Sequence, residues 1–160
     1  ETAKSEYIEL SKENYINEML ATGSLPVLMK NPITLNNKRK FDGGITDPLP
    51  VKKAYEMGAR DITLIRTYEE TFIRKTKFEN YIAALATKSY PNISRALISN
   101  TEIHNSALEF IKNPPSDCVI KQICPPHRLK TKRATTNHSI MKADYLVGTQ
   151  AGQKFLQKFL

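Results

Sequence analysis

Residues 39–65 constrain the fold more than any other stretch of this chain. A strand-like segment that ends at Phe41 leads into Asp42-Gly43-Gly44, and a continuous apolar run follows from Ile62 to Ile65. Such a run is typical of a strand that is buried on both faces of a parallel sheet. Between them, Asp47 is expected to cap a proline-led helix that stops at Gly58. Strand, loop, helix and strand in this order predict an α/β fold.

The rest of the chain contains further helix and strand signals. Before the Asp-Gly-Gly segment we expect a strand over residues 5–10, a helix over 14–22 that stops at Gly23, and a hairpin with arms 33–35 and 39–41. After it we expect long helices over 72–88 and 95–113, with Tyr90-Pro91-Asn92 as the break between them. A strand over 118–124 and a final helix to Leu160, capped by Asn137 or Ser139, complete the prediction.

Length and composition indicate one domain of a globular protein, because 160 residues with 40% apolar content can bury a single core. Cys118 and Cys124 would lie about 20 Å apart on a strand at ~3.3 Å per residue, too far to form a disulfide with each other. Buried, reduced thiols predict a cytoplasmic location. The chain begins with Glu1, so we expect it to be a piece of a longer protein.

The net charge is +8, and it is densest in a run made of Arg128, Lys130, Lys132 and Arg133. This run is either an ordinary solvated loop or a site of peripheral contact with an anionic membrane surface. Nucleic acid is not an expected partner, because few aromatic residues are interleaved with these charges.

Two groups of residues carry a resemblance to a known family. The Asp42-Gly43-Gly44 segment, with Asp47-Pro48-Leu49-Pro50 and the strand-like Asp61–Arg66 behind it, resembles the second signature block of the patatin-like phospholipases. Phe110-Ile111-Lys112-Asn113-Pro114-Pro115 is similar to a motif in the C-terminal region of one bacterial subgroup. In that subgroup a strand ending in Pro-Pro follows, and then a terminal helix that would start here near Asp144-Tyr145.

The resemblance implies a three-layer α/β/α sandwich and a serine lipid acyl hydrolase that cleaves carboxylic esters or phospholipids. Residues 1–70 would form the C-terminal half of the catalytic domain, and residues 71–160 a mostly helical region with one strand packed on the same domain. The family uses a Ser-Asp dyad and no catalytic histidine, metal or cofactor. Its Gly-x-Ser-x-Gly motif is absent from these 160 residues, so the nucleophile would lie in a missing N-terminal half and this chain alone would be inactive.

Asp42 is the residue to which the resemblance assigns catalysis. A serine hydroxyl becomes a good nucleophile when a nearby carboxylate accepts its proton, and glycines at positive φ would let the backbone approach the substrate closely. The turn Ser24-Leu25-Pro26 matches a family segment expected to shape the acyl pocket. In the alternative interpretation, Asp42 is an ordinary turn aspartate, and the protein is a basic module that binds anionic lipid or nucleic acid without catalysis.

Overall fold

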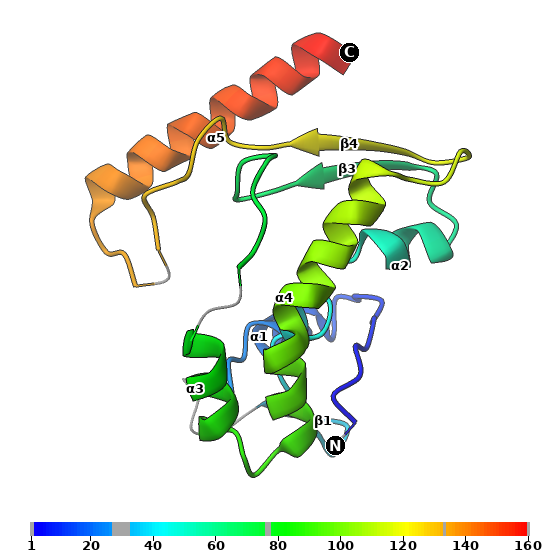
Figure 1. The fold of residues 1–160 in the computed structure, drawn as a ribbon, viewed down its shortest axis with the longest axis vertical. Helices are drawn as coiled ribbons and strands as arrows, with labels where there is room; N and C mark the ends of the chain where they lie inside the picture. The colour runs from blue at the N-terminus through cyan, green and yellow to red at the C-terminus, as the bar shows by residue number, and fades with distance from the viewer. Residues whose placement is uncertain (1, 27–32, 76–77, 133, 160) are drawn as a thin grey trace. The chain divides into compact units, whose positions relative to one another are not determined.

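The computed structural model describes residues 2–26, 33–75, 78–132 and 134–159 (Figure 1). Within these residues the chain contains five α-helices, one 3-10 helix and two sheets of two strands each. This mixed content confirms the α/β class. The chain divides into two compact units, one made of Glu1–Pro50 and Arg74–Glu109 and the other of Val51–Ile73 and Phe110–Leu160. Each unit therefore combines segments that are distant in the sequence.

The first unit contains helix α1 (Tyr15–Thr22), which stops at Gly23 as predicted. The backbone N–H of Gly23 donates to the carbonyl of Leu20 at 3.3 Å and closes the last turn. Only Ala21 of this helix is buried among the described residues, so the apolar face that the sequence predicted, which includes Ile16 and Met19, remains exposed.

The prediction of a strand over residues 5–10 is wrong. This segment is extended but belongs to neither sheet of the described chain, and Ile8 and Leu10 are exposed. Alternating polar and apolar residues suit a strand, but a strand also needs a neighbour to complete its backbone hydrogen bonds. No strand in the described chain pairs with residues 5–10. Side-chain hydrogen bonds from Ser5 and Tyr7 hold this segment in place instead.

The predicted hairpin is confirmed, with strands β1 (Ile33–Leu35) and β2 (Lys38–Lys40) pairing antiparallel. Asn36 and Asn37 connect them with φ values of 51° and 60°. Two positive φ values in a two-residue connection are typical of a type I′ turn, for which asparagine is a favoured residue. Strand β2 starts and ends one residue earlier than predicted, and the ring of Phe41 packs edge-on against Tyr90 at 5.7 Å.

Helices α3 (Phe78–Ala86) and α4 (Pro91–Lys112) differ from the prediction in where they begin. Pro91 was predicted to break the chain, but it opens α4. A proline is well placed in the first turn of a helix, because its missing N–H would have no partner there. The corner between the helices is closed by Thr87 and Ser94, whose hydroxyls lie 3.0 Å apart and bond to carbonyls at the end of α3.

The second unit begins with helix α2 (Val51–Glu56), which ends as predicted at Gly58. Gly58 has φ +102°, and its N–H donates to the carbonyl of Tyr55 at 2.9 Å. The next N–H, from Ala59, donates to the carbonyl of Ala54 at 3.0 Å. This pair of bonds is a Schellman motif, which favours glycine because of the left-handed backbone.

Strands β3 (Asp61–Ile65) and β4 (Val119–Ile123) lie side by side and parallel, as Figure 1 shows. Their pairing confirms the predicted parallel sheet. The prediction that β3 is buried on both faces is wrong, because Thr63 and Ile65 are exposed and Ile65 has 75% of its surface open. Burial of both faces requires a covering layer on each side of the sheet, and the described chain does not cover the face that carries Thr63 and Ile65.

Helix α5 (His138–Phe159) ends the described chain and contacts β4. The side chain of Asn137 accepts from the N–H groups of Ser139 and Ile140 at 3.0 and 3.2 Å, so Asn137 is the cap. The helix therefore starts before the position near Asp144 that the family resemblance implied. Leu160, the predicted end of the helix, lies outside the described residues.

Candidate functional site

Asp42 lies two residues after the end of β2 and begins a tight turn. We call residues 42–47 the Asp42 loop. The residue as a whole is half-buried, and its Oδ1 accepts from the backbone N–H of Gly44 at 2.8 Å in an exposed hydrogen bond. Among the described residues this is the one hydrogen bond that the carboxylate accepts. The backbone N–H of Asp42 donates to the carbonyl of Ser24 at 2.8 Å.

The two glycines do not have the positive φ values that the sequence predicted. They lie in the 3-10 helix η1 (Gly43–Ile45), whose backbone is right-handed. Their small size matters instead. A Cβ on Gly43 would lie 3.1 Å from the hydroxyl oxygen of Thr22, and one on Gly44 would lie 3.1 Å from Oδ1 of Asp42. Glycine thus lets the loop pack against α1 and lets the Asp42 carboxylate reach the Gly44 amide.

Asn100 of α4 holds the Asp42 loop from a distant part of the sequence. Its Nδ2 donates to the carbonyl oxygens of Gly44 at 2.8 Å and Ile45 at 2.9 Å. Its Oδ1 in turn accepts from the guanidinium of Arg74. Sequence reasoning missed Asn100, since a polar residue inside a helix carries no local signal for a partner 55 residues away.

The N-terminal segment, by which we mean residues 2–10, also contacts the Asp42 loop. The hydroxyl of Ser5 bonds to that of Thr46 at 2.8 Å, and Tyr7 donates to the carboxylate of Asp47. The prediction that Asp47 caps the next helix is therefore wrong. Helix α2 begins four positions later at Val51, which is too far for a cap, and the Asp47 carboxylate serves a tertiary contact.

A cavity of about 700 Å³ opens between the N-terminal segment, the hairpin and the Asp42 loop, and Asp42, Gly43 and Gly44 line it. Its wall carries four basic and four acidic side chains, so the cavity has no strong preference for one sign of charge. The residues that balance in this way are Lys4, Lys38, Arg39, Lys40, Glu6, Glu18, Asp42 and Asp47. Its size suits an organic substrate rather than a single ion.

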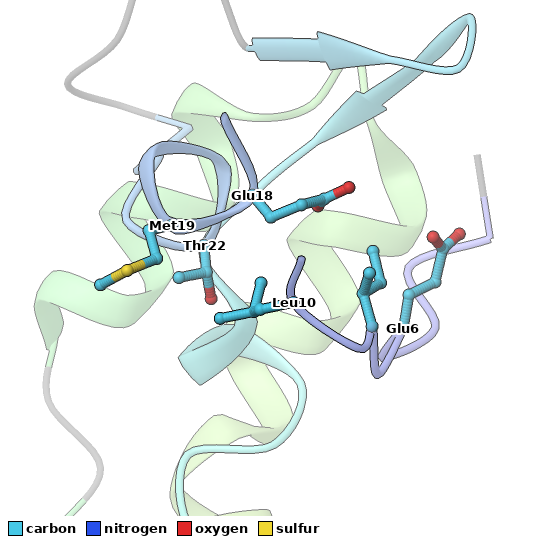
Figure 2. A pocket seen from close by; sticks show the side chains of 6 residues that line it. Glu6, Leu10, Glu18, Met19 and Thr22 are labelled. Carbon is cyan, nitrogen blue, oxygen red and sulfur yellow. The ribbon is translucent and has the colours of Figure 1, made fainter. Parts of the chain in front are cut away.

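A second, smaller hollow of about 200 Å³ lies between α1 and the N-terminal segment. Figure 2 shows side chains from both elements around it, with Leu10 and Glu6 opposite Glu18, Met19 and Thr22. A volume of about 200 Å³ is below the roughly 300–1,000 Å³ that is usual for a pocket that binds an organic ligand. The larger cavity, which includes Asp42, is therefore the better candidate site.

The turn Ser24-Leu25-Pro26 is adjacent to the Asp42 loop, as expected for a segment near the site. Ser24 is fully buried and contributes its carbonyl to the Asp42 backbone, whereas Ala21 and Thr22 supply side chains to the cavity wall. Leu25 and Pro26 are half-buried. Their assignment to an acyl pocket stays a prediction.

The remaining polar residues of interest lie outside the cavity. His104 is buried on α4, with Nδ1 3.4 Å from the amide oxygen of Asn105. Cys118 and Cys124 flank β4 as free thiols, and burial raises the pKa of Cys124. In the described ranges, no group of three or more His, Cys, Asp or Glu is arranged to hold a metal ion.

Comparison with known proteins gives two matches, and neither name states an activity. Residues 90–160 match the family described as "Domain of unknown function (DUF6363)", a range that does not include Asp42. The chain is 25% identical over 151 residues to "Uncharacterized protein YjjU" of Escherichia coli (strain K12), which covers 94% of this chain and 42% of that protein. The chain thus spans less than half the length of this relative. No solved structure matches.

None of the described helices combines the length and the hydropathy that are needed to cross a bilayer.

Proposed function

We propose that this chain is the aspartate-bearing part of a serine lipid acyl hydrolase, with Asp42 as the general base of a Ser-Asp dyad. The observation that carries the proposal is the position of Asp42. This residue lines a cavity of about 700 Å³, on a loop whose glycines leave room beside it. A base in such a place can reach a hydroxyl that enters the cavity.

In the proposed reaction, Asp42 accepts the proton of a serine hydroxyl while the serine oxygen attacks the ester carbonyl of a lipid. Asp42 gives that proton to the leaving alcohol oxygen as the ester bond breaks, which leaves an acyl-serine and a free Asp42 carboxylate. The carboxylate then accepts a proton from the water that attacks the acyl-serine and passes it to the serine oxygen as the acid is released. Donors outside this chain would stabilise the oxyanion. The reaction requires no metal or cofactor.

The serine is proposed to come from an N-terminal half that these 160 residues do not contain. Two observations support this arrangement. The relative from Escherichia coli is more than twice as long as the stretch it shares with this chain. In addition, β3 and β4 pair only with each other in the described chain, and such a small parallel pair is normally part of a larger covered sheet. A patatin-like α/β/α sandwich would supply that sheet.

The variant that tests the proposal is Asp42→Asn in the longer protein that contains the serine. Asparagine keeps an oxygen that can accept the Gly44 N–H, so the turn is preserved, but it cannot act as a base. We expect hydrolysis of a p-nitrophenyl ester to fall by at least about 100-fold, with an unchanged melting temperature.

Glu102→Gln is the matched control, because it removes a carboxylate from an exposed position of α4 that does not line the cavity. We expect this variant to keep nearly full activity. Turnover by Asp42→Asn close to that of the unmodified protein would contradict the assignment of Asp42, and absence of ester hydrolysis in the unmodified longer protein would contradict the hydrolase itself.

One observation favours the alternative, a basic binding module for anionic lipid or nucleic acid without catalysis. The contact between Asp42 Oδ1 and the Gly44 N–H is what an ordinary turn aspartate makes. Under this alternative, Asp42→Asn changes no measured property, since asparagine makes the same turn.

A further inference from the structure

Nearly all of the net charge of the chain resides in its last segment. Residues 118–160 contain eight Lys and Arg but a single acidic residue, Asp144, which amounts to +7 of the total +8. The other acidic side chains of the second unit include three that form ion pairs: Asp61 with Lys121, Asp117 with Arg60, and Glu56 with Lys53. Of these three pairs, only the one with Asp61 neutralises a cation of the C-terminal segment, Lys121, so the segment remains strongly positive.

The basic run is attached to helix α5. The backbone N–H of Thr131 donates to Oδ2 of Asp144 at 2.6 Å, and bonds from Thr131 lower the pKa of Asp144. This contact uses the one acidic residue of the segment to hold the loop beside the second turn of the helix. Arg128, Lys130 and Lys132 are exposed on this loop, while Arg133 lies outside the described residues.

Helix α5 carries an exposed apolar stripe next to this attachment point. Met141, Tyr145 and Leu156 are 44%, 71% and 51% exposed, and their spacing places them on one side of the helix. Gly148 and Gly152 lie between them in open space, with no atom within 4 Å of where a Cβ would be. Lys142 is exposed next to Met141. Figure 1 draws α5 as one continuous helix, coloured orange to red.

We propose that the loop cations and this stripe form one surface that docks on an anionic lipid bilayer. We call it the basic helix surface, made of Arg128, Lys130, Lys132, Met141, Lys142 and Tyr145. Lysine and arginine side chains would contact lipid phosphates, while Tyr145 and Met141 enter the interfacial region, where amphipathic side chains are stabilised. The inference does not depend on the catalytic role of Asp42.

The composition of the basic helix surface favours an anionic bilayer over a second copy of the chain or a single-stranded nucleic acid. A second copy of the chain would bring two surfaces of the same sign together, which opposes association. A single-stranded nucleic acid is bound with several stacking aromatic residues, and Tyr145 is the one aromatic residue of this surface. An anionic bilayer satisfies both the positive charge and the exposed apolar groups.

Co-sedimentation of the full chain with lipid vesicles tests the proposal. We expect binding to vesicles that contain phosphatidylglycerol, little binding to pure phosphatidylcholine, and weaker binding as salt increases. The triple variant Arg128→Gln, Lys130→Gln, Lys132→Gln should weaken binding by roughly 10- to 100-fold. Its matched control, Lys12→Gln, Lys52→Gln, Lys88→Gln, removes the same charge from exposed positions elsewhere and should retain most of the affinity.

Tyr145→Ser separates membrane insertion from attraction by charge alone. We expect it to weaken vesicle binding while leaving the melting temperature nearly unchanged, because the side chain is largely exposed. Equal losses in the two triple variants, no vesicle binding, or binding of a single-stranded oligonucleotide that vesicles cannot displace would each overturn the proposal. Asp42→Asn should bind vesicles normally, so failure of the hydrolase proposal and failure of this one are distinguishable.

Discussion

At the scale of single residues, the Asp42 loop depends on groups from several parts of the sequence. The carbonyl of Ser24 fixes its start, the amide of Asn100 binds the carbonyls of Gly44 and Ile45, and Ser5 bonds to Thr46. Hydrogen bonds to backbone groups are costly to remove when the partner cannot reach water. The position of the Asp42 carboxylate is thus determined by Asn100 as well as by its own turn.

Replacing Asn100 should therefore loosen the loop. Asn100→Ala removes the side-chain donor of two carbonyls, one of which is exposed to water, and we expect the free energy of unfolding to fall by about 0.5–1.5 kcal/mol. Urea unfolding measures this loss, and faster amide hydrogen exchange at Gly44 would locate it in the loop. Ser106→Ala, an exposed position on the same helix, is the control and should have little effect. If Asn100→Ala unfolds at the same urea concentration as the control, the two bonds do not stabilise the loop.

At the scale of elements, a polar cluster joins α2 to the beginnings of β3 and β4. Tyr55 donates to Asp117 at 2.9 Å, Arg60 donates to the other oxygen of that carboxylate at 2.7 Å, and the Arg60 guanidinium lies over the Tyr55 ring. The N–H of Val119 donates to the carbonyl of Arg60 at 2.7 Å, which starts the parallel ladder. The cluster therefore helps to set the register of two strands that are far apart in the sequence.

This cluster predicts a dependence of stability on pH. The pKa of Asp117 is lowered, chiefly by the hydrogen bond from Tyr55 and also by Arg60. The contribution of the ionised Asp117 carboxylate to folding stability is therefore complete above its ordinary pKa of 3.8. This contribution is lost as pH falls through the lower pKa that Asp117 has in the folded state. We expect Asp117→Asn to lower the melting temperature at neutral pH, and the difference from the unmodified protein to shrink in acid.

Thermal unfolding between neutral pH and about pH 3 measures this effect. Asp61→Asn is the control, because Asp61 pairs with Lys121 on the same sheet and lacks the tyrosine contact. A difference between Asp117→Asn and the unmodified protein that stays constant down to the acid end of the range would contradict the prediction.

At the scale of the whole molecule, the chain leaves part of its sheet uncovered. In the described residues β3 and β4 have no other partner strand, and Ile65 and Val119 are 75% and 56% exposed. Open strand edges beside apolar side chains favour association with another chain. We therefore expect the isolated chain to form assemblies larger than its 18.2 kDa monomer.

Ile65→Lys should shift these assemblies toward the monomer, because a charged side chain opposes pairing at the sheet edge. Thr63→Lys, on the same face of the same strand, adds the same charge without removing apolar surface and should have a smaller effect. Analytical ultracentrifugation over a range of concentrations measures both. A monomer at every concentration would show that the exposed strands do not drive association.

The sequence by itself determined the local structure wherever a residue acts on its own backbone. Asn36 and Asn37 specify the hairpin turn, Gly58 ends α2 with a left-handed residue, and Asn137 caps α5, each through bonds within a few residues. The parallel pairing of β3 was also predicted, from a short segment rich in β-branched residues that follows a helix. The turn at Asp42, in which the carboxylate accepts from the Gly44 N–H, was also predictable from its own short segment.

Only the tertiary structure decided which distant groups complete these elements. Residues 5–10 alternate like a strand but pair with no strand of the described chain. Asp47 bonds to Tyr7 instead of capping a helix, and Asn100 holds a loop 55 residues away. Each outcome depends on whether segments that are distant in the sequence come side by side. Local patterns report the preferences of neighbouring residues, whereas these contacts depend on where whole elements pack, and that is set by the fold as a whole.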